Sequence, residues 1–231
     1  MVGHGRGSRA KSDTVNARAA TYAERRARAD ARRAERATIE DAGVVLEAAA
    51  AFLAVRPRSV AETRRRLKDL GYQIGPVDVV IDRLLTFGYL DDAAFARTWV
   101  ESRDRTRPRG ESALRRELML KGIDREVIGE VLAERAEESH GGIASGVRSA
   151  PMQSPPGDAD DVAARRLLER RAALLRRDPD PRKRRHKAYA LLARNGFDPG
   201  VCARVASAFI ADIEPDEAGD QVDGDRRLTP P

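Results

Sequence analysis

The sequence predicts an all-α protein of three tandem three-helix repeats that pack into an elongated, curved array. Two observations carry this prediction. Charged residues make up 35% of the chain and aromatic residues only 4%, which is typical of helices with wide solvated faces. A spaced pattern of leucine, glycine and apolar residues also occurs three times along the chain. Few stretches alternate apolar and polar residues as strands do.

The repeat emerges when the chain is aligned on three glycines, Gly71, Gly122 and Gly196. A leucine stands four residues before each glycine, and large apolar, smaller apolar and valine residues follow at one, six and nine residues after it. These positions are Leu67, Leu118 and Leu192; Tyr72, Ile123 and Phe197; Val77, Ile128 and Cys202; and Val80, Val131 and Val205. One such unit buries little core, so neighbouring units are expected to pack on one another.

The segments follow from composition in chain order. Residues 1–40 hold ten basic and five acidic residues with no apolar stripe, which predicts a mostly disordered basic arm. Gly, Ser and Pro without periodicity indicate a linker over 137–157. The complete prediction is arm 1–40, first repeat 41–90, second repeat 91–136, linker 137–157, third repeat 158–213 and acidic tail 214–231.

Capping signals mark the helix boundaries. Ser59 and Glu62 have the spacing of a capping box, in which each side chain satisfies a free N–H of the helix start. The three aligned glycines are expected to end the middle helices in a left-handed conformation. The third helices are expected to start at Gly75-Pro76, Asp124 and Asp198-Pro199. The predicted caps and repeat markers are Ser59, Glu62, Gly71, Gly88, Asp91, Asp92, Gly122, Asp124, Gly196 and Asp198.

Adjacent carboxylates at Asp91 and Asp92 invite a metal or acid–base interpretation. No third carboxylate or histidine stands near them in the sequence, and they fall between a helix stop at Gly88 and an amphipathic run with Phe95 and Trp99. The favoured interpretation is that one aspartate caps the next helix and the other lies in its first turn.

Enzymatic chemistry finds no support in the sequence. The three histidines show no ligand spacing, the single Cys202 occupies an apolar repeat position, and no nucleophile motif is present. We therefore expect no catalytic residue, no metal and no cofactor. The absence of an apolar signal stretch and of a membrane-spanning run predicts a cytoplasmic location.

Charge placement is the strongest functional signal. The net charge is +6, and basic residues gather on the middle helix of each repeat and just before it. The candidate basic face comprises Arg56, Arg58, Arg64, Arg65, Arg66, Arg107, Arg109, Arg115, Arg116, Arg182, Lys183, Arg184, Arg185 and Lys187. Such a face suits a polyanion or a filament with regularly spaced partners; the alternative is a solvated face with local ion pairs. Because the last helices are apolar and not basic, they do not resemble recognition helices that read the major groove.

Three stretches, RPRSVAETRRRLKDLGY (56–72), LLTFGYLDDAAFARTWVESR (84–103) and ESALRRELMLKG (111–122), resemble the RecX family of recombination regulators. The resemblance covers 45–136 well and 158–212 more loosely. It implies three tandem three-helix repeats and a non-enzymatic, cytoplasmic, monomeric protein. It also implies binding to the RecA recombinase and its filament on single-stranded DNA, with inhibition of strand exchange, ATP turnover and the co-protease activity behind the SOS response.

A second hypothesis stays open beside the resemblance. The chain could be a helical protein that binds DNA without sequence preference and has no RecA partner. Binding to phosphates would in either case be salt-sensitive and sequence-blind.

Overall fold

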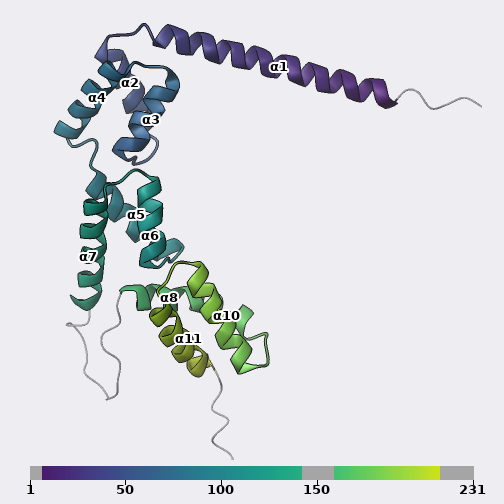
Figure 1. Ribbon diagram of the computed structural model, residues 1–231, viewed down its shortest axis with the longest axis vertical. Coiled ribbons are helices and arrows are strands. Elements are labelled where there is room, and N and C mark those ends of the chain that lie inside the picture. The colour runs from purple at the N-terminus through teal and green to yellow at the C-terminus, as the bar shows by residue number, and fades with distance from the viewer. Residues whose placement is uncertain (1–6, 142–158, 214–231) are drawn as a thin grey trace, which may run out of the picture. The chain divides into compact units, whose positions relative to one another are not determined.

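The computed structural model describes residues 7–141 and 159–213, and every regular element within these ranges is an α-helix (Figure 1). This confirms the predicted all-α class. The first domain contains α2 (Ala42–Leu53), α3 (Val60–Leu70) and α4 (Ile74–Thr86). The second contains α5 (Asp92–Thr106), α6 (Glu111–Leu120) and α7 (Arg125–Gly141), and the third contains α8 (Ala159–Glu169), α9 (Ala172–Leu175), α10 (Pro181–Arg194) and α11 (Pro199–Ile213).

The aligned positions of the repeat form the interior of each domain. All twelve aligned apolar side chains are buried, with exposed fractions of 8% or less. The three aligned glycines have φ angles of 108°, 78° and 82°, in the left-handed region that only glycine adopts readily. At Gly71 and Gly196 the following N–H donates to the carbonyl of the aligned leucine, which closes the helix end as a Schellman motif does.

The chain divides into two compact units that do not coincide with the sequence repeats. The first unit contains the chain up to Ala96 together with the turn Leu120–Asp124. The second contains Arg97–Met119 and the chain from Arg125 onward. The second domain is thus shared between the two units.

In the first unit, α2, α3 and α4 pack on one another around a core of Val45, Leu67, Val77 and Ile81. In the second unit, α11 packs against both α8 and α10 around Leu168, Leu192 and Phe209. Cys202 is buried in this core, as its repeat position predicts, and burial raises the pKa of its thiol.

Within the predicted disordered arm, residues 7–36 form a single helix, α1 (Gly7–Arg36). Alanine and arginine are strong helix formers, and no proline interrupts the segment, so local propensity alone favours a helix there. The described side chains of α1, from Thr21 to Glu35, are all exposed. The segment therefore lacks a core, as predicted, but not a helical backbone.

Three further boundaries differ from the prediction. The linker was expected from residue 137, but α7 continues to Gly141; the rest of the linker and the acidic tail lie outside the described residues. Helix α4 begins at Ile74, so Gly75 and Pro76 lie inside its first turn, where a missing N–H costs no helical bond. The first helix of the third domain is broken into α8 and α9, because Arg171 N–H donates three residues back to Leu168.

Candidate partner-binding site

The predicted basic residues of the first domain differ in whether another side chain of the same domain pairs with their charge. Arg64 pairs with Asp78 at 3.1 Å, and Arg56 lies 3.6 Å from Glu62. The guanidinium of Arg58 stacks on Phe52 with its carbon 4.1 Å from the ring centre, and that of Arg66 lies 5.8 Å from the same ring. Within the described residues, Arg65 is exposed and makes no ion pair. Among the described residues of this cluster, Arg65 thus has neither an ion pair nor a ring contact.

The second domain also has both paired and unpaired basic residues. Arg115 pairs with Glu111 at 2.7 Å, and Arg109 bonds to Asn195 and lies 3.6 Å from Glu117. Arg107 and Arg116 are exposed, and no carboxylate among the described residues lies within ion-pair distance of either. Two free cations therefore remain in this cluster.

The third domain gathers its free cations at the start of α10. Lys187 pairs with Asp178 at 2.7 Å, and this hydrogen bond lowers the pKa of the Asp178 carboxyl. Arg184 is half-buried, whereas Arg182, Lys183 and Arg185 are exposed and unpaired among the described residues. Positive charge at a helix N-terminus opposes the helix dipole, typically by about 0.3–1 kcal/mol per charge. The first turn of α10 carries no acidic residue, but the N-cap Asp180 accepts from the Arg182 and Lys183 N–H groups, and its carboxylate offsets part of this cost.

Two polar joints connect successive domains, and several predicted caps belong to them. In the first joint, Ser59 accepts from Glu62 N–H at 3.0 Å and donates to Lys121 O at 2.6 Å. Asp91 caps α5 by accepting from Ala94 N–H at 2.9 Å. Asp92 lies in the first turn of α5 but accepts from Val60 N–H at 2.9 Å, so it caps α3 of the preceding domain. Burial, opposed by that bond and aided by the Asp91 charge, raises the pKa of Asp92.

The predicted reciprocal bond of the capping box is absent. The Glu62 carboxylate instead binds Lys121 Nζ, and its second oxygen has no hydrogen-bond partner within the described part of the chain. Burial alone would raise the pKa of Glu62, but the hydrogen bond and charge of Lys121, together with Arg56, lower it overall. A charged partner from the next domain thus replaced the local backbone donor.

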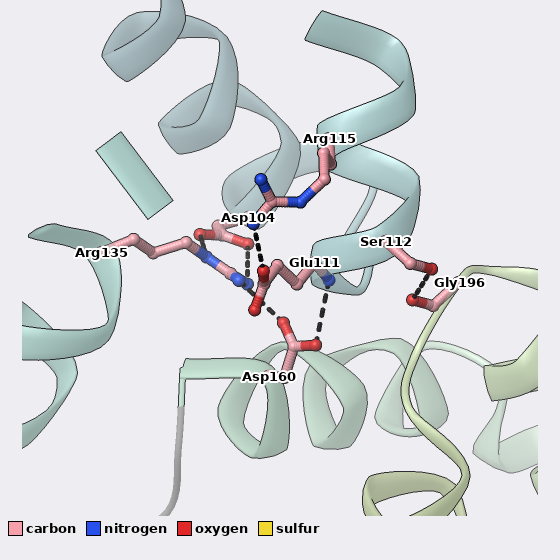
Figure 2. Close-up of polar contacts among 7 residues, drawn as sticks. All are labelled: Asp104, Glu111, Ser112, Arg115, Arg135, Asp160 and Gly196. Atoms are coloured by element: carbon pink, nitrogen blue, oxygen red, sulfur yellow. Dashed lines mark hydrogen bonds and ion pairs between the residues drawn. The ribbon is translucent and has the colours of Figure 1, made fainter. Parts of the chain in front are cut away.

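The second joint repeats this plan inside the second unit (Figure 2). Asp160 of α8 accepts from Glu111 N–H, the first residue of α6, at 3.0 Å. Ser112 donates to Gly196 O at 2.7 Å, as Ser59 does to Lys121 O in the first joint. Val60 and Glu111 both stand eleven residues before their aligned glycines, so the same position is capped in both domains.

A buried ion triad reinforces the second joint. Figure 2 shows the Arg135 guanidinium between two carboxylates, Asp104 at 2.9 Å and Asp160 at 2.7 Å. Burial alone would lower the pKa of Arg135, but the hydrogen bonds and charges of the two aspartates hold it above its usual value. Arg135 and Asp160 are among the least exposed charged side chains that the structure describes, at 9% and 8%, so this triad positions the third domain's first helix.

Sequence reasoning missed two hollows. A groove of about 700 Å³ in the first unit is lined by Leu46, Ala50, Leu53, Ala54, Arg83, Leu84, Phe87 and Tyr89. Phe87 and Tyr89, which flank Gly88, are 67% and 73% exposed, which is unusual for a pair of neighbouring aromatics. The available signal was that the other two repeats have no Phe, Tyr or Trp at the aligned positions.

The second hollow lies in the third domain and encloses about 550 Å³. Its lining combines apolar and cationic side chains: Arg171, Leu174, Leu175, Arg177, Asp178, Pro179, Lys187, Leu191 and Arg194. Leu174 is 57% exposed although its neighbour Leu175 is buried. Both hollows combine apolar side chains with at least one arginine in their lining.

No cluster of potential metal ligands occurs among residues 7–141 and 159–213. Over the same ranges, no helix is both long and apolar enough to cross a membrane.

Asp124 and Asp198 precede α7 and α11, and Asp198 accepts from Gly200 N–H at 2.7 Å.

These features define a class of protein: an all-α chain of three three-helix domains with polar joints and exposed cations on its middle helices. The profiles of the first, second and third three-helix domains of RecX match residues 46–84, 91–132 and 159–205. The chain therefore belongs to the RecX family of regulatory proteins, as the sequence resemblance implied.

Individual relatives agree with this assignment. The regulatory protein RecX of Mycobacterium ulcerans is 34% identical over 69% of this chain and 81% of its own length. RecX of Mycobacterium tuberculosis is 33% identical over 69% and 82%. The crystal structure of RecX from Lactobacillus salivarius has a TM-score of 0.58 at 18% identity, covering 74% of this chain and 97% of that one. At that identity the likeness supports the fold alone.

Proposed function

We propose that the chain binds the RecA recombinase and its filament on single-stranded DNA and inhibits strand exchange, ATP turnover and co-protease activity. It would act in the cytoplasm, without a catalytic step or a cofactor, and so restrain recombination and the SOS response. Membership of the RecX family supports a regulatory role, and the charge distribution supports a binding mode.

One observation carries the binding mode. Free cations recur on the middle helix of each domain or in the residues just before it: Arg65; Arg107 and Arg116; and Arg182, Lys183 and Arg185. A helical filament presents the same acidic or phosphate group at regular intervals, so one cation set per domain matches a repeating partner. The neighbouring paired arginines, such as Arg64 and Arg115, have their charge met inside the chain.

The test measures RecA-dependent ATP hydrolysis and strand exchange with the wild-type chain and with Arg65→Glu, Arg116→Glu and Arg185→Glu combined. We expect inhibition by the wild type and a large loss of inhibition in the triple variant. The matched control carries the same charge change at exposed arginines outside the middle helices, Arg125→Glu, Arg166→Glu and Arg176→Glu. It should inhibit like the wild type.

Two results would contradict the proposal. If the wild-type chain leaves RecA activity unchanged, the regulatory partner is not RecA. If the chain binds naked single strands and RecA filaments with equal, equally salt-dependent affinity, the rival hypothesis of a DNA-binding protein without a RecA partner is favoured instead.

A further inference from the structure

The helix α1 has a composition that folding does not require. Four of its arginines, Arg25, Arg28, Arg32 and Arg36, are spaced three, four and four residues apart and so share one face. Like charges at this spacing destabilise an isolated helix by about 0.2–0.5 kcal/mol per pair. In the described part of α1, none of the first three makes an ion pair. The stripe is therefore an uncompensated line of positive charge.

The stripe is presented to solvent and not to the core. Arg25, Arg28 and Arg32 are exposed, and the residues between them are mostly alanines, which leave the backbone open to close approach. The three acidic residues between Thr21 and Arg36 do not neutralise the six arginines there, and Arg26–Asp30, at 3.9 Å, is the ion pair that the structure shows in this stretch. Among the described residues, no ion pair thus neutralises Arg25, Arg28 or Arg32.

The C-terminal end of α1 is anchored to the first domain. Arg36 donates to Leu70 O at 3.4 Å and lies over the Tyr72 ring, with its guanidinium carbon 5.9 Å from the centre. Gln73 donates to Ala37 O, just beyond the helix. Gly71 lies so close to Arg33 that a Cβ there would fall 2.6 Å from the Arg33 carbonyl oxygen. The anchor ties the stripe to the first domain, so a ligand held by α1 is tethered to that domain.

We propose that α1 is a nucleic-acid-binding arm that holds a phosphodiester backbone along Arg25, Arg28 and Arg32. The guanidinium fork matches phosphate oxygens, and three arginines over two turns span about 10 Å, which corresponds to about three phosphates of one duplex strand. Tyr22, the one aromatic residue of α1, is 69% exposed and stands one turn before Arg25 and Arg26, where it can stack on a base. An exposed aromatic beside arginines favours nucleic acid over an acidic protein surface.

This inference does not rest on the RecA proposal, because its probe is naked nucleic acid. The test follows the fluorescence anisotropy of a labelled oligo-dT strand and of a labelled duplex over a range of salt concentrations, without RecA. The variant is Arg25→Ala, Arg28→Ala and Arg32→Ala combined, since alanine preserves the helix. For the single strand we expect the slope of log K against log salt to fall by about 2, with a roughly 100-fold weaker affinity at about 0.1 M salt.

Two matched variants make the result specific. Arg125→Ala, Arg166→Ala and Arg176→Ala remove the same charge elsewhere and should leave the slope unchanged. Arg25→Lys, Arg28→Lys and Arg32→Lys combined keep the charge and should retain the slope. Circular dichroism verifies that each variant keeps its helix content.

Three outcomes would overturn the inference. The first is an unchanged slope in the α1 alanine variant, and the second is an equal loss in the charge-matched control. The third is weakened binding to RecA filaments with unchanged binding to naked strands and duplex, which would make α1 a protein-binding arm. A loss on one naked probe alone identifies whether single strands or duplex are the ligand.

Discussion

At the scale of single residues, Asp160 links the second and third domains through two polar contacts. It accepts from the α6 N-terminus and from Arg135, and both its carboxylate oxygens are used. Asp160→Ala would remove one of the carboxylates that pair with the buried Arg135 and leave the Glu111 N–H without its cap. We expect a loss of about 3–5 kcal/mol, the usual cost of breaking a buried ion pair from one side, measured by urea unfolding followed by circular dichroism.

The control is an ion pair of similar geometry at the surface. Arg165 pairs with Asp212 at 2.8 Å, but both side chains are about half exposed. Arg165→Ala should cost less than about 1 kcal/mol. Equal losses in the two variants would show that the triad has no special role in stability.

Glu62 makes the first joint sensitive to pH. Its pKa is lowered in the folded state, so its carboxylate binds fewer protons there than in the unfolded chain. Its stabilising contribution is therefore present above the usual value of 4.5 and is lost as the pH falls through the folded pKa. We expect Glu62→Gln to lower the melting temperature at neutral pH, and we expect the difference from the wild type to narrow as the pH falls below 4.5. A difference independent of pH would contradict this account.

At the scale of elements, the left-handed glycines allow two costs of a substitution to be measured separately: backbone strain and steric overlap of the new side chain with a neighbouring helix. Gly122 and Gly196 have φ angles of 78° and 82°, and an added Cβ would fall 2.3 Å and 2.5 Å from the Cβ atoms of Ala61 and Ala113. Gly88 has a similar φ of 72° but open space around it. Gly88→Ala should cost about 1–2 kcal/mol from backbone strain alone.

Gly122→Ala and Gly196→Ala should cost about 1–3 kcal/mol more than Gly88→Ala, because the new methyl group must push the neighbouring helix start away. Chemical denaturation of all three variants supplies the comparison. If Gly88→Ala proves as destabilising as the others, the close approach at the joints contributes nothing, and the glycines serve only to end helices.

Helix α1 shows how an element can form without a core. Local propensity and the absence of breakers make the helix, while the contacts of Arg36, Gly71 and Gln73 fix only its C-terminal end. Composition correctly predicted the absence of an apolar face. It could not exclude a helix, because low hydrophobicity rules out packing and not backbone hydrogen bonding.

At the scale of the whole molecule, the proposed function implies that several domains bind one filament together. Linked sites gain affinity over a single site by a factor on the order of 10²–10⁴. Reversing the cations of the third domain alone, Arg182→Glu, Lys183→Glu and Arg185→Glu, should therefore weaken binding to the RecA filament by roughly 100-fold or more. Binding to monomeric RecA, which offers fewer repeated sites, should weaken much less.

Surface plasmon resonance with immobilised filaments and with RecA monomers makes this comparison. Equal losses on the two surfaces would mean that the third domain binds independently of the others. That result would contradict shared binding while leaving an interaction with RecA intact.

The sequence showed which basic residues belong to the candidate site, but it did not show which of them are paired with a carboxylate. The sequence located the basic residues, because lysine and arginine gather around each middle helix. It could not tell Arg65 from Arg64, since the pairing of Arg64 with Asp78 depends on how α3 and α4 pack. The groove beside Phe87 and Tyr89 was also missed, because a hollow arises from the spacing between helices and leaves no local pattern.

The sequence by itself determined the helical class, the three repeats and the twelve aligned core positions. Each of these depends on short spacings, which recur whenever the same residue types follow one another along a helix. Only the tertiary structure decided the joints. Asp92 caps a helix that starts 32 residues earlier, and Asp160 one that starts 49 residues earlier. No periodicity links residues so far apart, because their meeting depends on how domains pack and not on how helices form.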